Sequence, residues 1–361
     1  MAITTLDGVI AGAQYPRYFN KAVNSGNFVA GRPHALHTLG TSTASVPPLA
    51  VLGSAVGNMP QNYTITAMSK ANPTIVSCAG HPWANNDYVS FEGTNCVPSA
   101  DDLVYQISNV VAGTSFTVPH NVNTTAGTTG RCSGLTGGVA TDNPLNGSAL
   151  TSFSGQLPFT NPTSGNTYLS RFLGYSSGQA GTLMLCDRLL HTGGYMPTKT
   201  TAQTGPVPTQ IPARDINGTN NGVGVYAALE VYSALGNSTA TPTLTYTDSS
   251  GNAGATTTTT RALANGAIAG SFLPFDLAAG DVGIQKVQAL TLGATASSGV
   301  LGVVLYRVIA RLEIPNSIPA AMDILSGGFA RIYDDSCLFL VFIPNTTTTS
   351  GIKGYVVWTQ G

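Results

Sequence analysis

The sequence predicts an all-β protein built around a jelly-roll-like β-sandwich, and three observations lead to this fold class. Only 9% of the 361 residues are charged, and 42 Gly and 21 Pro divide the chain into short segments. Many of these segments are rich in β-branched residues and are bounded by turn signals. Long helical patterns between them are scarce, which favours a sandwich over a parallel sheet with crossover helices. At this length we expect more than one domain.

Residues 1–61 are expected to form an extended N-terminal arm that lies on a partner or on the protein's own surface. Short apolar pieces such as "STASVPPLAVLG" alternate here with Gly and Pro, so a helix is not expected. Disorder is the alternative, but the aromatic residues of the arm argue against it. Since Arg and Tyr are typical interface anchors, we expect the arm to bind its partner through Tyr15, Arg17, Tyr18, Phe19 and Arg32.

Residues 62–141 are expected to form a small inserted β-module. Short strands follow one another here with turn residues between them, in "YTITAM", "TIVSCAG", "DYVSFEG" and "LVYQISNVVAGTSFTV". The stretch "TTAGTTGRCSGLTGG" that follows is rich in Gly and Thr, and we interpret it as a linker.

Residues 142–361 are expected to form the main β-sandwich domain. Its strands are predicted in "TYLSRFLGYSS", "GTLMLCDRLLHTGG", "VGVYAALEVYSAL", "PTLTYTDSSGNAGATTTTTRAL", "VGIQKVQALTLGAT", "GVLGVVLYRVIARLEI", "CLFLVFIPN" and "IKGYVVWTQG". The fourth of these folds back as a hairpin through "DSSGN", because Asp, Gly and Asn tolerate left-handed backbone angles. The best helix candidates are short, in "DRLLHTG" and "IPAAMDILSGG".

The cysteines and histidines of the sequence are candidates for a metal site. Five such residues fall within the module, namely Cys78, His81, Cys96, His120 and Cys132. Only Cys78 and His81 have the close spacing of structural zinc ligands, so we expect no metal. A disulfide between two of Cys78, Cys96 and Cys132 stays open, and buried free thiols are the alternative. Two further cysteines, Cys186 and Cys337, lie in apolar strands and are interpreted as core residues.

Catalytic patterns are weak in this sequence. No G-x-S-x-G nucleophile turn and no phosphate-binding Gly loop occurs. His191 near Asp187 resembles half of a catalytic dyad, but both follow a predicted strand end in a turn-like segment. The acid pairs at 101–102 and 334–335 do not lie in a calcium-binding loop pattern. We therefore expect neither an enzyme nor a bound cofactor.

The charge pattern limits the partners. Lys and Arg total 15 against 16 Asp and Glu, so no basic surface for nucleic acid is expected. The apolar stretch "SGVLGVVLYRVIARLEI" contains Arg307 and Arg311, which favours a strand over a membrane-spanning helix. The opening residues lack the pattern of a signal peptide. We therefore expect no membrane partner, and synthesis in a cytoplasm that keeps thiols reduced.

The stretch "ANPTIVSCAGHPWANNDYVSF" resembles a small β-barrel module that is often inserted in virion proteins of tailed bacteriophages. It is similar to the FCCH-type domain of ubiquitin-activating enzymes. The matching positions are Asn72, Pro73, Val76, His81, Asp87, Val89 and Phe91, while Pro82 and Asn86 replace the turn glycines of that pattern. The resemblance implies that His81 and Asp87 shape a loop and do not catalyse.

Other parts of the chain also look like a phage virion structural protein, among them "LDGVIAGAQYPRYFNKA", "GQLPFTNPTSGNTYLSRF" and "GYVVWTQG". This resemblance implies a structural virion protein, made in the host bacterial cytoplasm, and is not specific to one role. Our first hypothesis is a decoration (cement) protein on the virion head surface. We expect a homo-oligomer, a trimer as first choice, that binds the major capsid protein. The alternative is a tail, baseplate or head-fibre component whose module binds a host glycan. A glycan-binding site would be indicated by clustered exposed aromatic residues. The candidates are Trp83, Tyr88 and Phe91, of which Phe91 is expected in the core.

Overall fold

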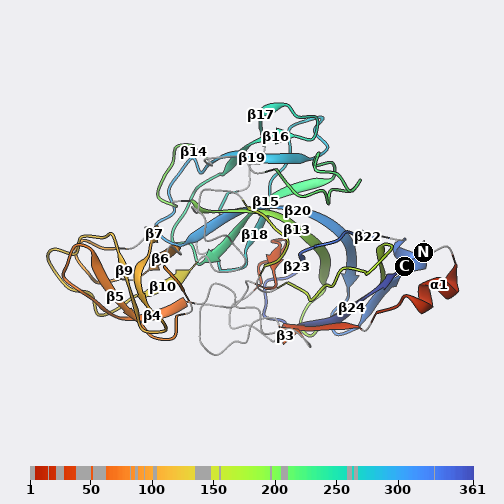
Figure 1. The fold of residues 1–361 in the computed structure, drawn as a ribbon, viewed down its shortest axis with the longest axis horizontal. Coiled ribbons are helices and arrows are strands. Elements are labelled where there is room, and N and C mark those ends of the chain that lie inside the picture. Colours follow the sequence, from red (N-terminus) through yellow and green to blue (C-terminus); the bar gives the residue numbers. More distant parts are fainter. Residues whose placement is uncertain are drawn as a thin grey trace.

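The predicted all-β fold class is confirmed (Figure 1). The structure is a computed structural model. It describes residues 5–14, 16–21, 28–37, 50–51, 62–81, 83–85, 88–92, 94–100, 104–134, 148–153, 156–195, 197–204, 210–257, 262–263, 267–328 and 330–361. All the paired strands within these residues are antiparallel. None of the helices found there is long and apolar enough to cross a membrane.

A seven-stranded sheet, called here the central sheet, organises the main domain. Its strands run in the order β18–β15–β20–β13–β23–β2, and β11 pairs with β13. The bounds are β2 His34–Ala35, β11 Ser148–Ala149, β13 Gly181–Tyr195, β15 Val225–Ser233, β18 Phe272–Pro274, β20 Val300–Ile314 and β23 Leu338–Pro344. The two longest strands, β13 and β20, pair with each other along nearly their whole length.

Two further sheets pack against one face of the central sheet. The terminal sheet has the order β21–β12–β24–β1–β3, with β22 beside β12, and the small sheet has the order β14–β19–β16–β17. Terminal-sheet bounds are β1 Arg17–Lys21, β3 Ala50–Val51, β12 Thr167–Ser176, β21 Ala320–Asp323, β22 Arg331–Ile332 and β24 Ile352–Gln360. Small-sheet bounds are β14 Gln203–Thr204, β16 Thr243–Asp248, β17 Ala253–Thr256 and β19 Ile284–Thr291.

The central sheet therefore takes part in two sandwiches. Side chains such as Leu183, Leu312 and Phe172 form a core with the terminal sheet. Others, such as Leu229 and Leu290, form a second core with the small sheet. The chain runs from β20 in the central sheet to β21 and β22 in the terminal sheet, back to β23 in the central sheet and then to β24 in the terminal sheet. Such repeated crossing between two packed sheets is typical of a jelly roll.

The module is a seven-stranded sheet in the order β7–β6–β10–β4–β5–β9–β8. Its bounds are β4 Asn62–Met68, β5 Thr74–Cys78, β6 Tyr88–Glu92, β7 Val104–Gln106, β8 Ser108–Val111, β9 Ser115–Val118 and β10 Arg131–Gly134. It has a core of its own, with Val76, Phe91 and Phe116 at its centre. In Figure 1 the module lies at one end of the molecule, and both chain termini lie at the other.

The N-terminal residues differ from the expected extended arm. A helix, α1, spans Leu6–Ala11, where we expected none. Its N-cap is Thr5, whose hydroxyl accepts a hydrogen bond from the backbone N–H of Gly8 at 3.1 Å. The expectation missed this cap because it relied on the Gly and Pro spacing of the whole arm. Strand β1 pairs with β24 over all five of its residues and so belongs to the terminal sheet.

Three other local predictions are corrected. The segment "DRLLHTG" is not a helix but the middle of β13, because β20 and β23 pair with it on either side. In "IPAAMDILSGG" only α2, Ile324–Gly327, is helical, and β21 precedes it. The supposed linker contains β10, which pairs with β4 and β6. The expectations for Tyr15, Pro82, Asn86, Asp87 and the acid pair at 101–102 lie outside the described residues.

Candidate functional site

The candidate site is built on β13, whose side chains alternate between the two faces of the central sheet. One face, the covered face, carries Leu183 and Leu185, which pack under the terminal sheet. The other, the open face, carries Met184 and Cys186, which belong to a separate apolar cluster. Two charged residues interrupt the pattern, Asp187 on the covered face and Arg188 on the open face. Each is the centre of a buried polar network.

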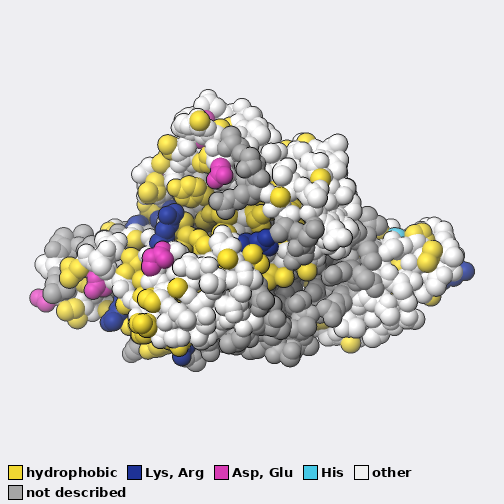
Figure 2. Space-filling view, turned by 180° about the vertical axis from the view of Figure 1, so that it is seen from behind, with side chains coloured by type: hydrophobic (Ala, Val, Ile, Leu, Met, Phe, Trp, Pro, Cys, Tyr) yellow, Lys and Arg dark blue, Asp and Glu magenta, His cyan; other side chains and the backbone are white. Residues whose placement is uncertain are grey.

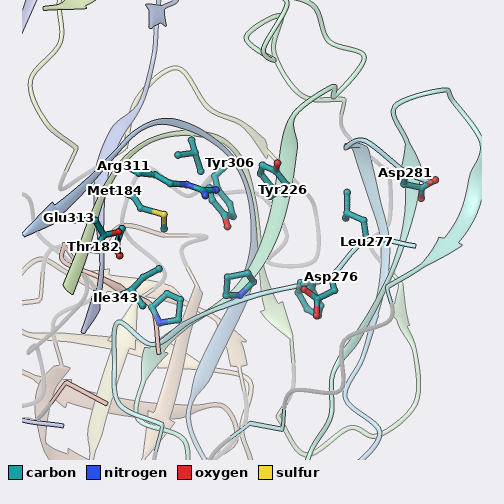
Figure 3. Close-up of a pocket in the computed structure, with 14 residues that line it drawn as sticks. Thr182, Met184, Tyr226, Asp276, Leu277, Asp281, Tyr306, Arg311, Glu313 and Ile343 are labelled. Atoms are coloured by element: carbon teal, nitrogen blue, oxygen red, sulfur yellow. Dashed lines mark hydrogen bonds between the residues drawn. The ribbon is translucent and has the colours of Figure 1, made fainter. Parts of the chain in front are cut away.

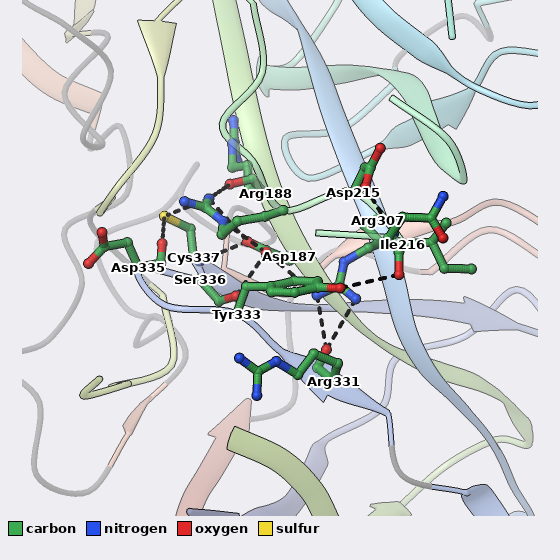
Figure 4. Close-up of polar contacts among 12 residues, drawn as sticks. Asp187, Arg188, Asp215, Ile216, Arg307, Arg331, Tyr333, Asp335, Ser336 and Cys337 are labelled. Atoms are coloured by element: carbon green, nitrogen blue, oxygen red, sulfur yellow. Dashed lines mark hydrogen bonds and ion pairs between the residues drawn. The ribbon is translucent and has the colours of Figure 1, made fainter. Parts of the chain in front are cut away.

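On the covered face, Asp187 lies where the two sandwich cores meet. Its neighbour Leu185 belongs to the core under the terminal sheet, and Leu190 belongs to the core under the small sheet. Its carboxylate accepts hydrogen bonds from Arg214 Nε at 3.1 Å and Nη2 at 3.3 Å. It also accepts bonds from Ser336 Oγ at 2.9 Å and from the N–H of Cys337 at 2.8 Å (Figure 4).

A second arginine completes this network. Arg307 Nη2 lies 3.8 Å from Asp187 Oδ2, and both terminal nitrogens of Arg307 donate to the carbonyl of Arg331 at 3.1 Å. The Arg307 guanidinium also lies 5.0 Å from the ring centre of Tyr333, whose hydroxyl donates to the carbonyl of Ile216 (Figure 4). One buried carboxylate thus holds three segments together at the junction between the cores.

The loop after Arg214 fixes the position of that arginine. Asp215 is buried and accepts hydrogen bonds from backbone N–H groups of its own loop, those of Asn217, Thr219, Gly222 and Val223. The hydroxyl of Thr219 adds a further bond at 2.6 Å. Because the loop closes on Asp215, the preceding side chain is presented to Asp187.

On the open face, Arg188 is the centre of the second network. Its Nη2 lies 2.9 Å from Glu230 Oε2 and donates to Tyr232 Oη at 2.7 Å and to His191 Nδ1 at 2.6 Å. Its Nη1 donates to His37 Nε2 at 3.0 Å. All five side chains are buried. The network therefore joins β13 and β15 to the segment after β2.

Burial and charge set the protonation of this network. Burial lowers the pKa of His37 to about 4, with Arg188 opposing its charge and Glu230 favouring it. The pKa of His191 is also well below its ordinary value, through burial first and then the charge of Arg188. Burial opposes the charge of Arg188, but Glu230 and Tyr232 keep its pKa above the usual range. The histidines are therefore neutral at pH 7 and accept hydrogen bonds from a charged arginine.

Beyond this network the open face forms a groove of about 550 Å³ (Figure 3). Its floor consists of Met184, Tyr226, Tyr306, Val308, Ile343 and the prolines Pro33 and Pro274. One rim carries Arg311 and Glu313, and the other carries Asp276 and Asp281. The volume lies within the usual range of ligand sites. Tyr226 is 40% exposed, so an aromatic ring of the floor is open to a partner.

The molecular surface also shows where apolar side chains gather. Figure 2 shows the face opposite to that of Figure 1, and hydrophobic side chains gather there where the upper lobe meets the body. Basic and acidic side chains lie beside them. Contiguous apolar surface beside polar residues is typical of an interaction site.

The residues predicted to anchor the arm have different environments. Phe19 is 2% exposed and lies in the core with the terminal sheet, so it supports the fold there. Tyr18 is 47% exposed and packs edge-to-face on Tyr355, with ring centres 5.6 Å apart. Arg17 lies over the ring of Trp358 and is partly buried, as is Arg32. Tyr15, as stated, is outside the described residues.

The cysteines and histidines of the module do not converge on one point. Among the described residues, no group of three or more His, Cys, Asp or Glu side chains lies close enough to hold a metal ion. His120 bonds instead with the Tyr105 hydroxyl at 2.7 Å and donates to the Pro98 carbonyl at 3.0 Å. Cys78 and Cys132 meet in the module core, with their sulfurs 2.9 Å apart. As predicted, Cys186 and Cys337 are buried.

The structure also shows the environments of residues that the sequence linked to a catalytic dyad and to a glycan site. Asp187 and His191 do not bond with each other, because one belongs to the covered-face network and the other to the open-face network. Trp83 and Phe91, two members of the expected glycan-binding aromatic group, are buried in the module core. The sequence did contain a signal for the site it missed, because charged residues within otherwise apolar strands mark both networks.

No protein-family model and no curated protein matches this chain. Among solved structures, the D431N mutant VP2 protein of infectious bursal disease virus, in T=1 particles, is 11% identical. That match covers 96% of this chain and 77% of the VP2 chain, with a TM-score of 0.13. The VP2 subviral particle of the same virus is 10% identical, with coverages of 85% and 83% and a TM-score of 0.14. TM-scores this low carry no argument about fold or function.

Proposed function

We propose that this chain is a structural virion protein of a tailed bacteriophage, a decoration protein that binds the head surface as a homotrimer. The groove on the open face of the central sheet is the observation that carries this proposal. It is an apolar surface with an exposed Tyr226, in a chain of which only 9% is charged. A surface with few charges does little to prevent association. The proposed role requires no cofactor and no catalytic group.

A second copy of the chain is the partner that best fits the groove. Its two rims differ in charge, since Arg311 and Glu313 balance each other on one rim while Asp276 and Asp281 make the other acidic. Around a three-fold axis, one rim of each copy meets the other rim of the next, which closes a ring. The acidic rim of one copy then lies beside Arg311 of its neighbour. Tyr226 provides an aromatic anchor of the kind that dominates interface energies, and the buried Tyr306 packs beside it with ring centres 6.2 Å apart.

The terminal sheet is proposed as the surface that contacts the major capsid protein. Of the predicted anchors that the structure describes, Tyr18 is the most accessible. It lies on β1 beside Tyr355 of β24, so two tyrosines present their rings together at the same part of this sheet. We assign Arg17 and Arg32 a supporting role in this contact, because both are partly buried. The groove and the terminal sheet then serve different partners.

Light scattering of the purified chain tests the oligomer. We expect a trimer for the natural sequence and dissociation for Tyr226→Lys, which places a charge on the apolar floor. Loss of an aromatic anchor costs about 2 kcal/mol, which raises the dissociation constant by roughly 30-fold. Tyr18→Ala serves as the matched control and should leave the trimer intact. A monomer formed by the natural sequence at micromolar concentration contradicts the assembly proposal.

Co-sedimentation with heads that lack this protein tests the second contact. We expect Tyr18→Ala to reduce binding at least tenfold, although the trimer persists. A trimeric Tyr18→Ala variant that still decorates heads like the natural chain would show that β1 is not the capsid contact. If the natural chain forms a trimer but binds tails and not heads, the decoration role is wrong and the assembly proposal survives.

A further inference from the structure

Two thiols face each other inside the module. Cys78 ends β5 and Cys132 lies on β10, and both side chains are fully buried in the module core. Their sulfur atoms are 2.9 Å apart. Cys96 belongs to the same core, but its thiol donates to the carbonyl of Pro98 at 3.3 Å. The structure therefore separates one pair from the three cysteines whose pairing the sequence left open.

The strand order explains why these two thiols meet. Strand β4 lies between β5 and β10, with Ile65 opposite Cys78 and Tyr63 opposite Cys132. In a flat sheet, side chains on the two outer strands of such a trio lie too far apart to touch. Here the register of β4 shifts between Ile65 and Ala67, and such irregularities bend a strand. A bend in β4 turns its two neighbours toward each other, and the contact between the two sulfurs shows that interior side chains of β5 and β10 meet.

We propose that Cys78 and Cys132 form an intramolecular disulfide when the chain meets a small-molecule disulfide such as oxidised glutathione. A thiolate of the pair attacks one sulfur of the reagent, forms a mixed disulfide and releases one glutathione thiolate. The second cysteine then attacks the protein sulfur of that mixed disulfide and releases the other glutathione. In total, the two thiols lose two protons and two electrons, and the reagent is reduced to two thiols. A disulfide bond is about 2.05 Å long, so the sulfurs approach by roughly 1 Å.

Burial determines when this reaction proceeds. The thiolate is the reactive form, and burial raises the pKa of Cys132, which a hydrogen bond with Cys78 raises further. No path for the reagent exists while both thiols are fully buried. Exchange therefore requires opening of the module, either during folding or by local unfolding. Once formed, the bond links positions 54 residues apart and restricts the unfolded chain, which stabilises the module. This inference does not depend on the proposed virion role.

Intact mass after alkylation tests the proposal on the natural chain. The protein is purified under reducing conditions, incubated with oxidised glutathione in mild urea, and alkylated with iodoacetamide after full denaturation. With five cysteines, the reduced chain takes five alkyl groups, and the oxidised chain should take three. Five groups after prolonged oxidation would overturn the proposal.

Peptide mapping identifies the partners. Trypsin together with a glutamate-specific protease should release peptides 71–92, 93–131 and 132–171, each with one of the three module cysteines. We expect a cross-link between the first and the third. A cross-link that involves peptide 93–131 contradicts the assignment, because that peptide carries Cys96.

Thermal melting tests whether the disulfide stabilises the protein. Oxidation should raise the melting temperature of the natural chain and of Cys96→Ala, but should leave that of Cys78→Ala and Cys132→Ala unchanged. An equal rise in Cys78→Ala would contradict stabilisation by this pair. Since the mapping uses the natural chain, the proposal stays testable if one variant fails to fold.

Discussion

Replacement of Asp187 by Asn is the sharpest test of how the two sandwiches are held together. The change keeps the size of the side chain but removes the only carboxylate that the described structure places between Arg214 and Arg307. Both arginines are buried there, and Asp187 is fully buried. The variant therefore leaves two cations side by side in a place that water does not reach.

The expected loss of stability follows from this geometry. Asp187 accepts two bonds from Arg214, one from Ser336 and one from the backbone of Cys337. Removing one partner of a buried ion pair costs about 3–5 kcal/mol, because the remaining charge is uncompensated. For a domain of about 200 residues this corresponds to a fall in melting temperature of roughly 10 °C. Since the pair is buried, the loss should persist at high salt.

Calorimetric melting at pH 7, in low salt and in 1 M NaCl, measures this loss. Asp334→Asn is the matched control, because it makes the same chemical change at an exposed position close to Ser336. We expect it to stay within about 0.5 kcal/mol of the natural chain. If Asp187→Asn melts within about 2 °C of this control, the carboxylate does not hold the junction and the reasoning is wrong.

Two further predictions concern acid stability and the module. Burial lowers the pKa of His37 to about 4 and that of His34 to about 3, against an ordinary value of 6.5. The unfolded chain therefore binds protons first, so the stability present above pH 6.5 should fall as the pH drops toward 4. Melting temperatures between pH 7 and 4 should show this fall, and His37→Gln should make it shallower; equal slopes would contradict it. Deletion of residues 62–141, with a short Gly linker, should leave a cooperatively melting main domain, because the module has its own core. Only aggregated protein would show that the module is not separable.

Much of the fold follows from local patterns in the sequence. The predicted strand "TYLSRFLGYSS" corresponds to β12, whose side chains alternate between buried and less buried positions. In "DSSGN", Asp248 accepts bonds from the backbone of Ser250 and Asn252, and Gly251 has the expected positive φ of 87°. Both features depend on residues close together in the chain, so sequence analysis finds them.

Which strands pair with each other, and which face of a sheet a side chain occupies, depend on residues far apart in the chain. The sequence therefore did not reveal them. From the sequence, β1 is interpreted as part of an arm, because its pairing partner β24 lies more than 300 residues later in the chain. The bend in β4 brings Cys132, and not Cys96, next to Cys78, and no local pattern in the sequence distinguishes these two candidates.

The sequence by itself determined that this chain is an all-β protein with low charge, because composition and period-two alternation are properties of short segments. The tertiary structure decided the rest. It placed Asp187 and Arg188, adjacent in the sequence, in two networks on opposite faces of one sheet. It also left the floor around Tyr226 uncovered among the described residues. The reason is that burial and ion pairing depend on which sheets pack together, and strands distant in the chain fix that packing.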